Sequence, residues 1–123
     1  MSAQARLVLD HGVAECGGPV VGTVHWTGNR RRQPVAVVLH YRTEGRGDVD
    51  AGVVAGHDLG DAEAGEARFR LEVPPLGPVT YHGQLLRLLW QVAVQIPASR
   101  SYHRSRTGSA TADLTVVPRG WLR

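Results

Sequence analysis

The segment from Leu85 to Pro97 has an unbroken alternation of side-chain types, and this pattern restricts the fold more than any other feature. Every second position holds a large apolar residue: Leu86, Leu88, Trp90, Val92, Val94 and Ile96. A period of two places all six on one face of a β-strand. A helix is the rival interpretation of this run, but the Val-rich second half favours a strand. We therefore expect a long strand in the middle of a sheet, with Trp90 anchoring the core.

Six further segments show the same period, separated by short stretches rich in glycine, proline and polar residues. Their expected bounds are Ala5–Asp10, Val20–Trp26, Val35–Arg42, Val49–Leu59, Ala67–Pro74 and Thr111–Pro118. No segment combines a 3.6-residue period with helix-capping residues. The chain is therefore predicted to be all-β and to form an immunoglobulin-like β-sandwich of about seven strands.

The segment Val49–Leu59 is the weakest of these strands, because Gly52 and Gly56 interrupt it. Glycine inside a strand is typical of a bulge or of an edge position. An exposed edge can accept a strand from another molecule. We therefore expect this segment to form an edge through which the protein dimerises or captures a peptide from a protein partner.

The length of 123 residues suits a single domain, in which residues 118–123 are expected to form a flexible tail. Cys16 is the one cysteine, so neither an internal disulfide nor a cysteine metal cage is expected. The first 25 residues lack the continuous apolar core of a signal peptide, and no apolar run reaches the roughly 18 residues that span a bilayer. We expect a soluble, cytoplasmic protein.

Catalytic and metal-binding motifs are missing from the sequence. The six histidines show no His-x-His or His-x-x-x-His spacing, and Cys16 has no basic neighbour in sequence. His25 and His40 are expected on the outward faces of strands that are neighbours in sequence, where they would approach each other if those strands pair; solvated histidines are the simpler interpretation. The prediction is a protein that is not an enzyme and has no catalytic residue, cofactor or metal.

Two arginine-rich segments are the candidate partner-binding sites. The first comprises Arg30, Arg31 and Arg32; the second comprises Arg100, Tyr102, Arg104 and Arg106. Guanidinium groups beside an aromatic ring suit nucleic-acid phosphates and bases, and they also suit an acidic peptide or an anionic lipid surface. However, all 14 basic residues are arginine, which is typical of a GC-rich genome, and solvated loops are the simpler interpretation of both clusters.

The stretch from Pro74 to Gly83 is expected to be scaffold. Pro74 and Pro75 cannot donate to a strand ladder and so end the preceding strand, and Gly77-Pro78 turns the chain. Tyr81 and His82 are expected to pack at the corner that follows.

Taken together, the chain resembles the arrestin-like β-sandwich family from about Ala5 to Val117. The resemblance is carried by "CGGPVVGTVHW", by "PVAVVLHYRTEG" and above all by "ARFRLEVPPLGPVTYHGQLLRLLWQVAVQIP". In the last of these, a Phe-x-Leu strand leads through a Pro-rich turn and a Tyr-x-Gly element into a long strand with a central Trp. Within that family, the chain resembles small bacterial proteins linked to sporulation control.

The resemblance implies a non-enzymatic protein-binding adaptor or scaffold. Arrestins have two sandwiches in tandem, whereas this chain has the length of one, so functions that need two cooperating domains do not carry over. The sequence also shows no residues that match the family's polar core.

Overall fold

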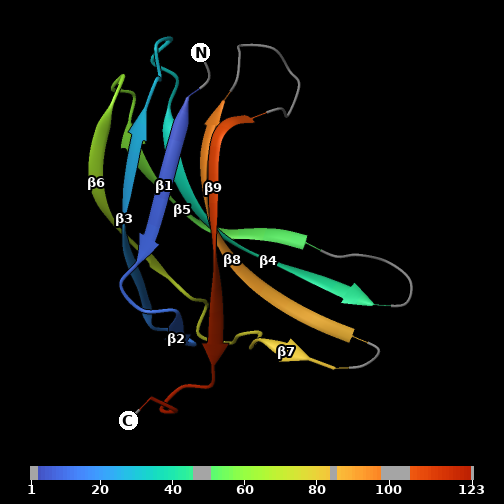
Figure 1. Cartoon of the computed structure of the whole chain (residues 1–123). Helices are drawn as coiled ribbons and strands as arrows, with labels where there is room; N and C mark the ends of the chain where they lie inside the picture. The colour runs from blue at the N-terminus through green and yellow to red at the C-terminus, as the bar shows by residue number, and fades with distance from the viewer. Residues whose placement is uncertain (1–2, 46–50, 84–85, 98–105, 123) are drawn as a thin grey trace.

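The computed structural model describes residues 3–45, 51–83, 86–97 and 106–122, which fold as strands and turns without a helix (Figure 1). The described residues form nine strands: β1 (Gln4–Leu9), β2 (Val13–Glu15), β3 (Pro19–Thr27), β4 (Val35–Gly45), β5 (Ala51–Gly60), β6 (Gly65–Glu72), β7 (Tyr81–His82), β8 (Leu86–Pro97) and β9 (Arg106–Val117). Seven of these are the expected strands. The two additional ones, β2 and β7, are three and two residues long, too short to show a period.

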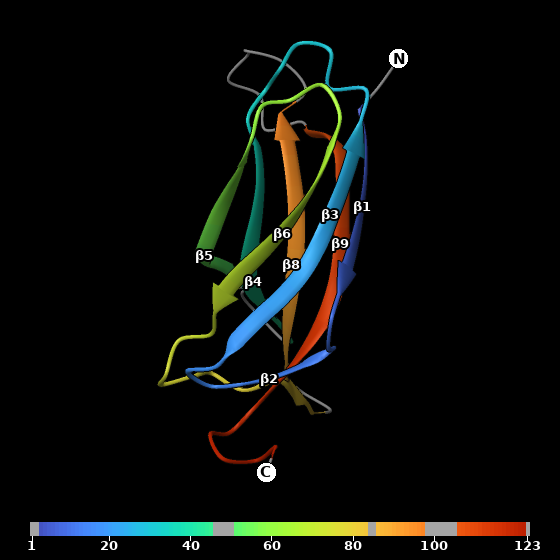
Figure 2. The ribbon, with the colours of Figure 1, turned by 90° about the vertical axis from the view of Figure 1, so that its left-hand side faces the viewer.

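The strands form two facing sheets, as Figure 2 shows with the smaller sheet in front of the larger one. The smaller sheet has the order β1-β3-β6. The larger sheet has the order β2-β9-β8-β4-β5, with β7 also paired to β8. All pairings are antiparallel except that of β2 with β9. The predicted all-β sandwich is confirmed.

The core lies between the sheets, and β8 contributes its centre. Trp90, Val92, Val94 and Ile96 are each no more than 1% exposed. They pack with Val35, Val37 and Leu39 from β4, and with Val24, Phe69 and Leu71 from the smaller sheet. The period of two in the sequence therefore identified the buried face of β8, and Trp90 occupies the core as predicted.

Two local expectations were wrong. The last strand begins at Arg106 rather than Thr111, because residues 106–110 pair with the end of β8 despite the turn-forming Gly108-Ser109. Tyr81 and His82 do not pack at a corner: they form β7, pair with Leu88 and Arg87, and have exposed side chains.

Candidate interaction surfaces

Strand β5 forms one edge of the larger sheet, as the sequence predicted. Within the described residues it pairs with β4 on one side and has no strand on the other. The pairing with β4 shifts register twice, between Val35 and Ala36 and between Leu39 and His40. The edge position is therefore confirmed, whereas the bulges of β5 lie at Val54 and Leu59 and not at its glycines. Of the expected strand Val49–Leu59, residues 49 and 50 lie outside the described part of the chain.

The open side of β5 has little protection against another strand. Val53 is 64% exposed and Val54 is 37% exposed, and the charged residues of the strand gather at its far end, at His57 and Asp58. Natural edge strands are commonly protected by charged side chains, by proline or by short length. Here ten residues run without proline or a basic residue other than His57, so the edge is suited to strand addition.

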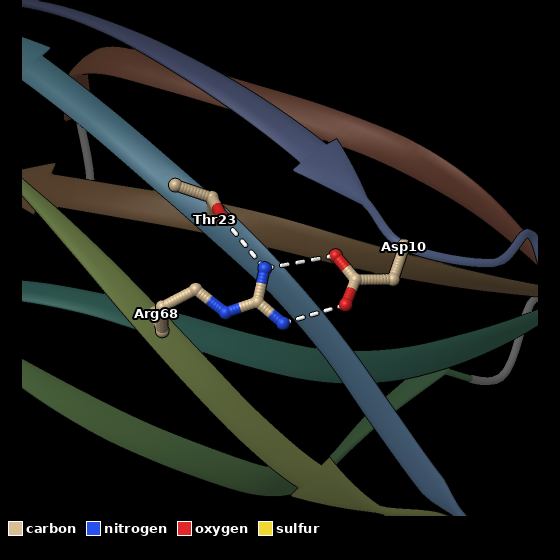
Figure 3. Close-up of polar contacts among 3 residues, drawn as sticks. All are labelled: Asp10, Thr23 and Arg68. Carbon is tan, nitrogen blue, oxygen red and sulfur yellow. Dashed lines mark hydrogen bonds and ion pairs between the residues drawn. The ribbon is translucent and has the colours of Figure 1, made fainter.

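The edge strand β6 of the smaller sheet is protected in the way that β5 is not. Its outward positions hold charged, exposed side chains: Glu66, Arg68, Arg70 and Glu72. Arg68 forms a two-pronged ion pair with Asp10, which follows β1, and its Nη1 also contacts the Thr23 hydroxyl on β3 at 3.0 Å (Figure 3). This cluster ties all three strands of the sheet together. The sequence did not reveal it, because Asp10 and Arg68 are 58 residues apart.

The first arginine cluster lies on a turn between β3 and β4 that a buried asparagine holds in place. Asn29 is 3% exposed; its Nδ2 donates to the Gln33 and Ala62 carbonyl oxygens at 2.9 and 3.0 Å, and its Oδ1 accepts from Gln33 N at 3.1 Å. Arg32 adopts a left-handed backbone conformation with φ of 49°. The turn is therefore fixed from inside while Arg30, Arg31 and Arg32 are exposed.

The antiparallel pairing of β4 with β8 places Arg106, the part of the second arginine-rich segment that the structure describes, at the same end of the sandwich as the turn with Arg30, Arg31 and Arg32. Ala36, near the start of β4, pairs with Gln95 near the end of β8, and Pro97 pairs with Arg106. Arg106 is described by its backbone alone, and Arg100, Tyr102 and Arg104 lie outside the described residues. Arg30, Arg31 and Arg32 form no ion pair with the described part of the chain.

Acidic residues at that end reduce its positive charge. Asp61 and Glu63 are exposed in the turn between β5 and β6, and the Glu63 carbonyl accepts a hydrogen bond from Asn29 N at 2.9 Å. The acidic turn and the arginine turn are thus neighbours. This mixed charge favours a local contact with an anion over long-range attraction of a polyanion.

His25 and His40 do not approach each other, because β3 and β4 lie in different sheets and do not pair. His25 Nε2 lies 3.5 Å from Glu66 Oε1 on the outer face of the smaller sheet. His40 is partly buried, and this burial, together with the positive charge of Arg42, lowers its pKa below the ordinary 6.5. No three His, Cys, Asp or Glu side chains converge as metal ligands in the residues that the structure describes.

Comparison with known proteins shows the fold. The sequence matches no protein-family model, and no curated protein matches it. Spo0M, a sporulation control protein from Bacillus subtilis, has a solved structure that matches with a TM-score of 0.66 at 16% sequence identity. The match covers 94% of this chain and 49% of that chain, so this chain spans about half the length of Spo0M. The arrestin-like β-sandwich is confirmed. In its described residues the chain has no helix long and apolar enough to cross a membrane.

Proposed function

We propose that this chain is a non-enzymatic protein-interaction module, an adaptor or scaffold, that binds an extended segment of a partner protein along β5. The observation that carries this proposal is the open side of β5, where Val53 and Val54 are exposed and residues 51–56 include no charged side chain. The fold alone does not imply the function, since one architecture serves many activities. The fold contributes a rigid sheet whose edge is ready to pair.

In strand addition, backbone pairing provides affinity and side-chain contacts provide specificity. The backbone N–H and C=O groups on the open side of β5 would pair with the incoming strand, which gives affinity with little dependence on sequence. Alternate side chains of that strand would lie on the same face as Val53, which is 64% exposed and opposite His40 on β4. We therefore expect a preference for small apolar or β-branched residues at alternate positions.

The proposal takes the protein to act in the cytoplasm of a bacterium. The lone Cys16 is buried and free, the ordinary state of a cysteine in a reducing compartment. The likeness to a bacterial sporulation control protein supports the same setting.

The proposal can be tested with a displayed library of random ten-residue peptides selected against the intact chain. Selected peptides should slow hydrogen exchange of amides in β5, and Val53→Lys should weaken their binding by about tenfold or more, because lysine on an open edge disfavours strand addition. Thr111→Lys is the matched control, since Thr111 is exposed on the same sheet but lies on β9, which β8 and β4 separate from β5.

Two results would refute strand addition at β5. One is a set of tight-binding peptides that leave the exchange of residues 51–60 unchanged. The other is equal loss of binding in Val53→Lys and Thr111→Lys. Self-association that only Val53→Lys abolishes would identify a second copy of the chain as the strand partner.

A second candidate function is binding of nucleic acid or an anionic surface through the arginine turn. It is favoured by the exposed Arg30, Arg31 and Arg32 on a backbone that Asn29 fixes. Single-stranded DNA and vesicles with anionic lipid are the two probes. The wild-type chain should bind one of these probes, and that binding should weaken steeply as salt rises. Changing all three arginines to glutamine should abolish it. Binding to both probes that is indifferent to salt and to these changes would refute this role.

A further inference from the structure

Gly52 leaves a gap among the side chains of the edge strand β5 (Figure 2), and the ring of Tyr41 lies against that gap. Gly52 pairs with Tyr41 on β4, so both residues belong to the face of the larger sheet that is turned toward the core. A Cβ added to Gly52 would lie 3.4 Å from Tyr41 Cε1 and 3.6 Å from the hydroxyl oxygen, which is contact distance. The tyrosine ring therefore leans from β4 over the backbone of β5.

Tyr41 continues a row of aromatic side chains that begins in the core. Its cross-strand neighbour on β8 is Trp90, and the two ring centroids lie 5.4 Å apart with the rings tilted by 48°. Trp90 is 1% exposed, whereas Tyr41 is only partly buried, so the row becomes more accessible toward β5. At Gly52 the row stops, because glycine has no side chain. A strand added to β5 would supply the next side chain of this row.

An aromatic side chain suits that position on the added strand, because it is long enough to reach across the glycine. Aromatic residues opposite a strand glycine cover the glycine backbone, and aromatic cross-strand pairs stabilise a sheet. Neighbouring strands lie about 4.8 Å apart, so a ring on the added strand would meet Tyr41 over Gly52 in a tilted or offset arrangement. A short side chain such as alanine would leave the edge of the Tyr41 ring exposed.

The charge at the other end of β5 favours a basic residue on the same added strand. Asp58 is exposed and forms no ion pair with the described residues. On β4, Ala36 pairs with Asp58 and Tyr41 pairs with Gly52, which is a spacing of five residues. A straight strand added antiparallel, the more stable pairing, would have the same spacing. Charge and shape together therefore specify a basic residue followed, five positions later, by an aromatic one.

We propose that the partner segment accepted by β5 runs antiparallel to it, with an aromatic residue opposite Gly52 and a basic residue opposite Asp58. The aromatic ring packs on Tyr41 across the glycine. This inference rests on the proposed strand addition at β5 and adds the chemistry and the direction of the partner segment. Because backbone pairing depends little on sequence, these two side-chain contacts distinguish one extended segment from another.

Labelled ten-residue peptides test the aromatic position. Each peptide alternates threonine and valine, with arginine at its third position and tryptophan, leucine or alanine at its eighth. Fluorescence anisotropy gives the dissociation constants, and hydrogen exchange of residues 51–60 reports whether a peptide pairs with β5. The tryptophan peptide should bind about three- to tenfold more tightly than the alanine peptide, as expected for one aromatic pair.

Two changes to these peptides test the basic position and the direction. Replacing the arginine by glutamate should weaken binding by about threefold at low salt, and Asp58→Asn should remove that difference. A reversed peptide, with tryptophan third and arginine eighth, should bind more weakly than the original. Equal binding of the arginine and glutamate peptides would contradict the basic position, and equal binding of the reversed peptide would contradict the direction.

Two glycine variants locate the aromatic contact, and neither glycine has the positive φ that would exclude valine. Gly52→Val fills the gap and separates Tyr41 from the added strand, so this variant should bind the tryptophan and alanine peptides equally. Gly56→Val is the matched control, since it adds the same side chain to β5 on the opposite face, where the nearest atom is Val38 Cγ1 at 3.7 Å. The control should keep the preference for tryptophan.

Failure of this inference differs from failure of strand addition itself. If the peptides slow exchange in β5 but tryptophan and alanine bind equally, this inference is overturned and strand addition stands. A tryptophan preference that persists in Gly52→Val also overturns it, because the ring then lies elsewhere. If no peptide slows the exchange of residues 51–60, strand addition at β5 and this inference are both refuted.

Discussion

The indole N–H of Trp90 donates to the carbonyl oxygen of Pro78 at 3.0 Å. Trp90 lies in the middle of β8, and Pro78 belongs to the turn that precedes it by 12 residues. Trp90 is also 1% exposed, and its ring centroid lies 5.4 Å from that of Tyr41 on β4. One side chain thus fills the centre of the core and fixes the turn between β6 and β8.

Replacing Trp90 by phenylalanine should lower the free energy of unfolding by about 1–3 kcal/mol, because it leaves a cavity and an unpaired carbonyl at Pro78. Urea unfolding followed by circular dichroism measures this change. Trp121→Phe is the control: Trp121 is 68% exposed, so at low protein concentration the stability should change by less than about 0.5 kcal/mol. Equal effects of the two substitutions would contradict the role of Trp90.

Asn29→Ala should be among the most destabilising changes outside the apolar core. The substitution removes three hydrogen bonds of a side chain that is 3% exposed, and leaves the Gln33 amide without its acceptor. The expected loss is about 2–3 kcal/mol in the free energy of unfolding. Arg30→Ala, one residue along the same turn but exposed, should cost less than about 0.5 kcal/mol. If Asn29→Ala leaves the free energy of unfolding unchanged in chemical denaturation, the Asn29 side chain does not hold the turn with Arg30, Arg31 and Arg32 in place.

Two glycines inside strands should respond oppositely to alanine. A Cβ on Gly22 would lie 2.5 Å from the Val8 carbonyl oxygen and 2.8 Å from Phe69 Cε2, so the smaller sheet must distort; we expect a loss of about 1–3 kcal/mol. At Gly56 the nearest atom is Val38 Cγ1 at an ordinary 3.7 Å, and alanine there should be neutral or slightly stabilising. Thermal unfolding of both variants checks the contrast, and a stable Gly22→Ala protein would refute the close approach of β1 and β3.

The sequence predicted the sandwich because its long strands carry their own signal. Alternation along β8 and β6 is enforced by one buried face, and it identified Trp90 as inward-facing; the same alternation along β6 buries Phe69. Short pairings carry no such signal: β2 is defined by its parallel ladder with β9, which local sequence does not encode. The same holds for the sheet to which each strand belongs, so the sequence left open whether the strands of His25 and His40 pair, and they do not.

The candidate surfaces divide in the same way. The β5 edge was predictable from Gly52 and Gly56, because glycine weakens a strand wherever it lies. The hydrogen bonds from Asn29 to the Gln33 and Ala62 carbonyls were not predictable, since an asparagine in a Gly-Asn turn is ordinarily solvated. Its burial depends on the distant β5–β6 turn. The hydrogen bond from Leu122 N to Glu15 Oε1 was not predictable either, because the two residues are 107 positions apart in the sequence.

The ion pair between Asp10 and Arg68 should make stability depend on pH in the acid range. Hydrogen bonding from the Arg68 guanidinium holds the pKa of Asp10 below its ordinary value of 3.8. A carboxyl group whose pKa is lower in the folded than in the unfolded chain stabilises the fold when it is ionised. Its contribution is therefore complete above pH 3.8 and declines as the pH falls through the folded-state pKa.

Asp10→Asn isolates this contribution. Both side chains of the pair are partly exposed, so the effect is small and should shrink further as salt rises. The difference in urea midpoint between wild type and Asp10→Asn should be constant from pH 7 down to about pH 5 and then narrow as the pH falls below 4. Glu63→Gln is the control, since Glu63 is exposed and forms no ion pair with the described residues, and its difference from wild type should not follow this profile. If the difference in urea midpoint between wild type and Asp10→Asn widens toward low pH, folding raises the pKa of Asp10. The ion pair between Asp10 and Arg68 would then not form in solution.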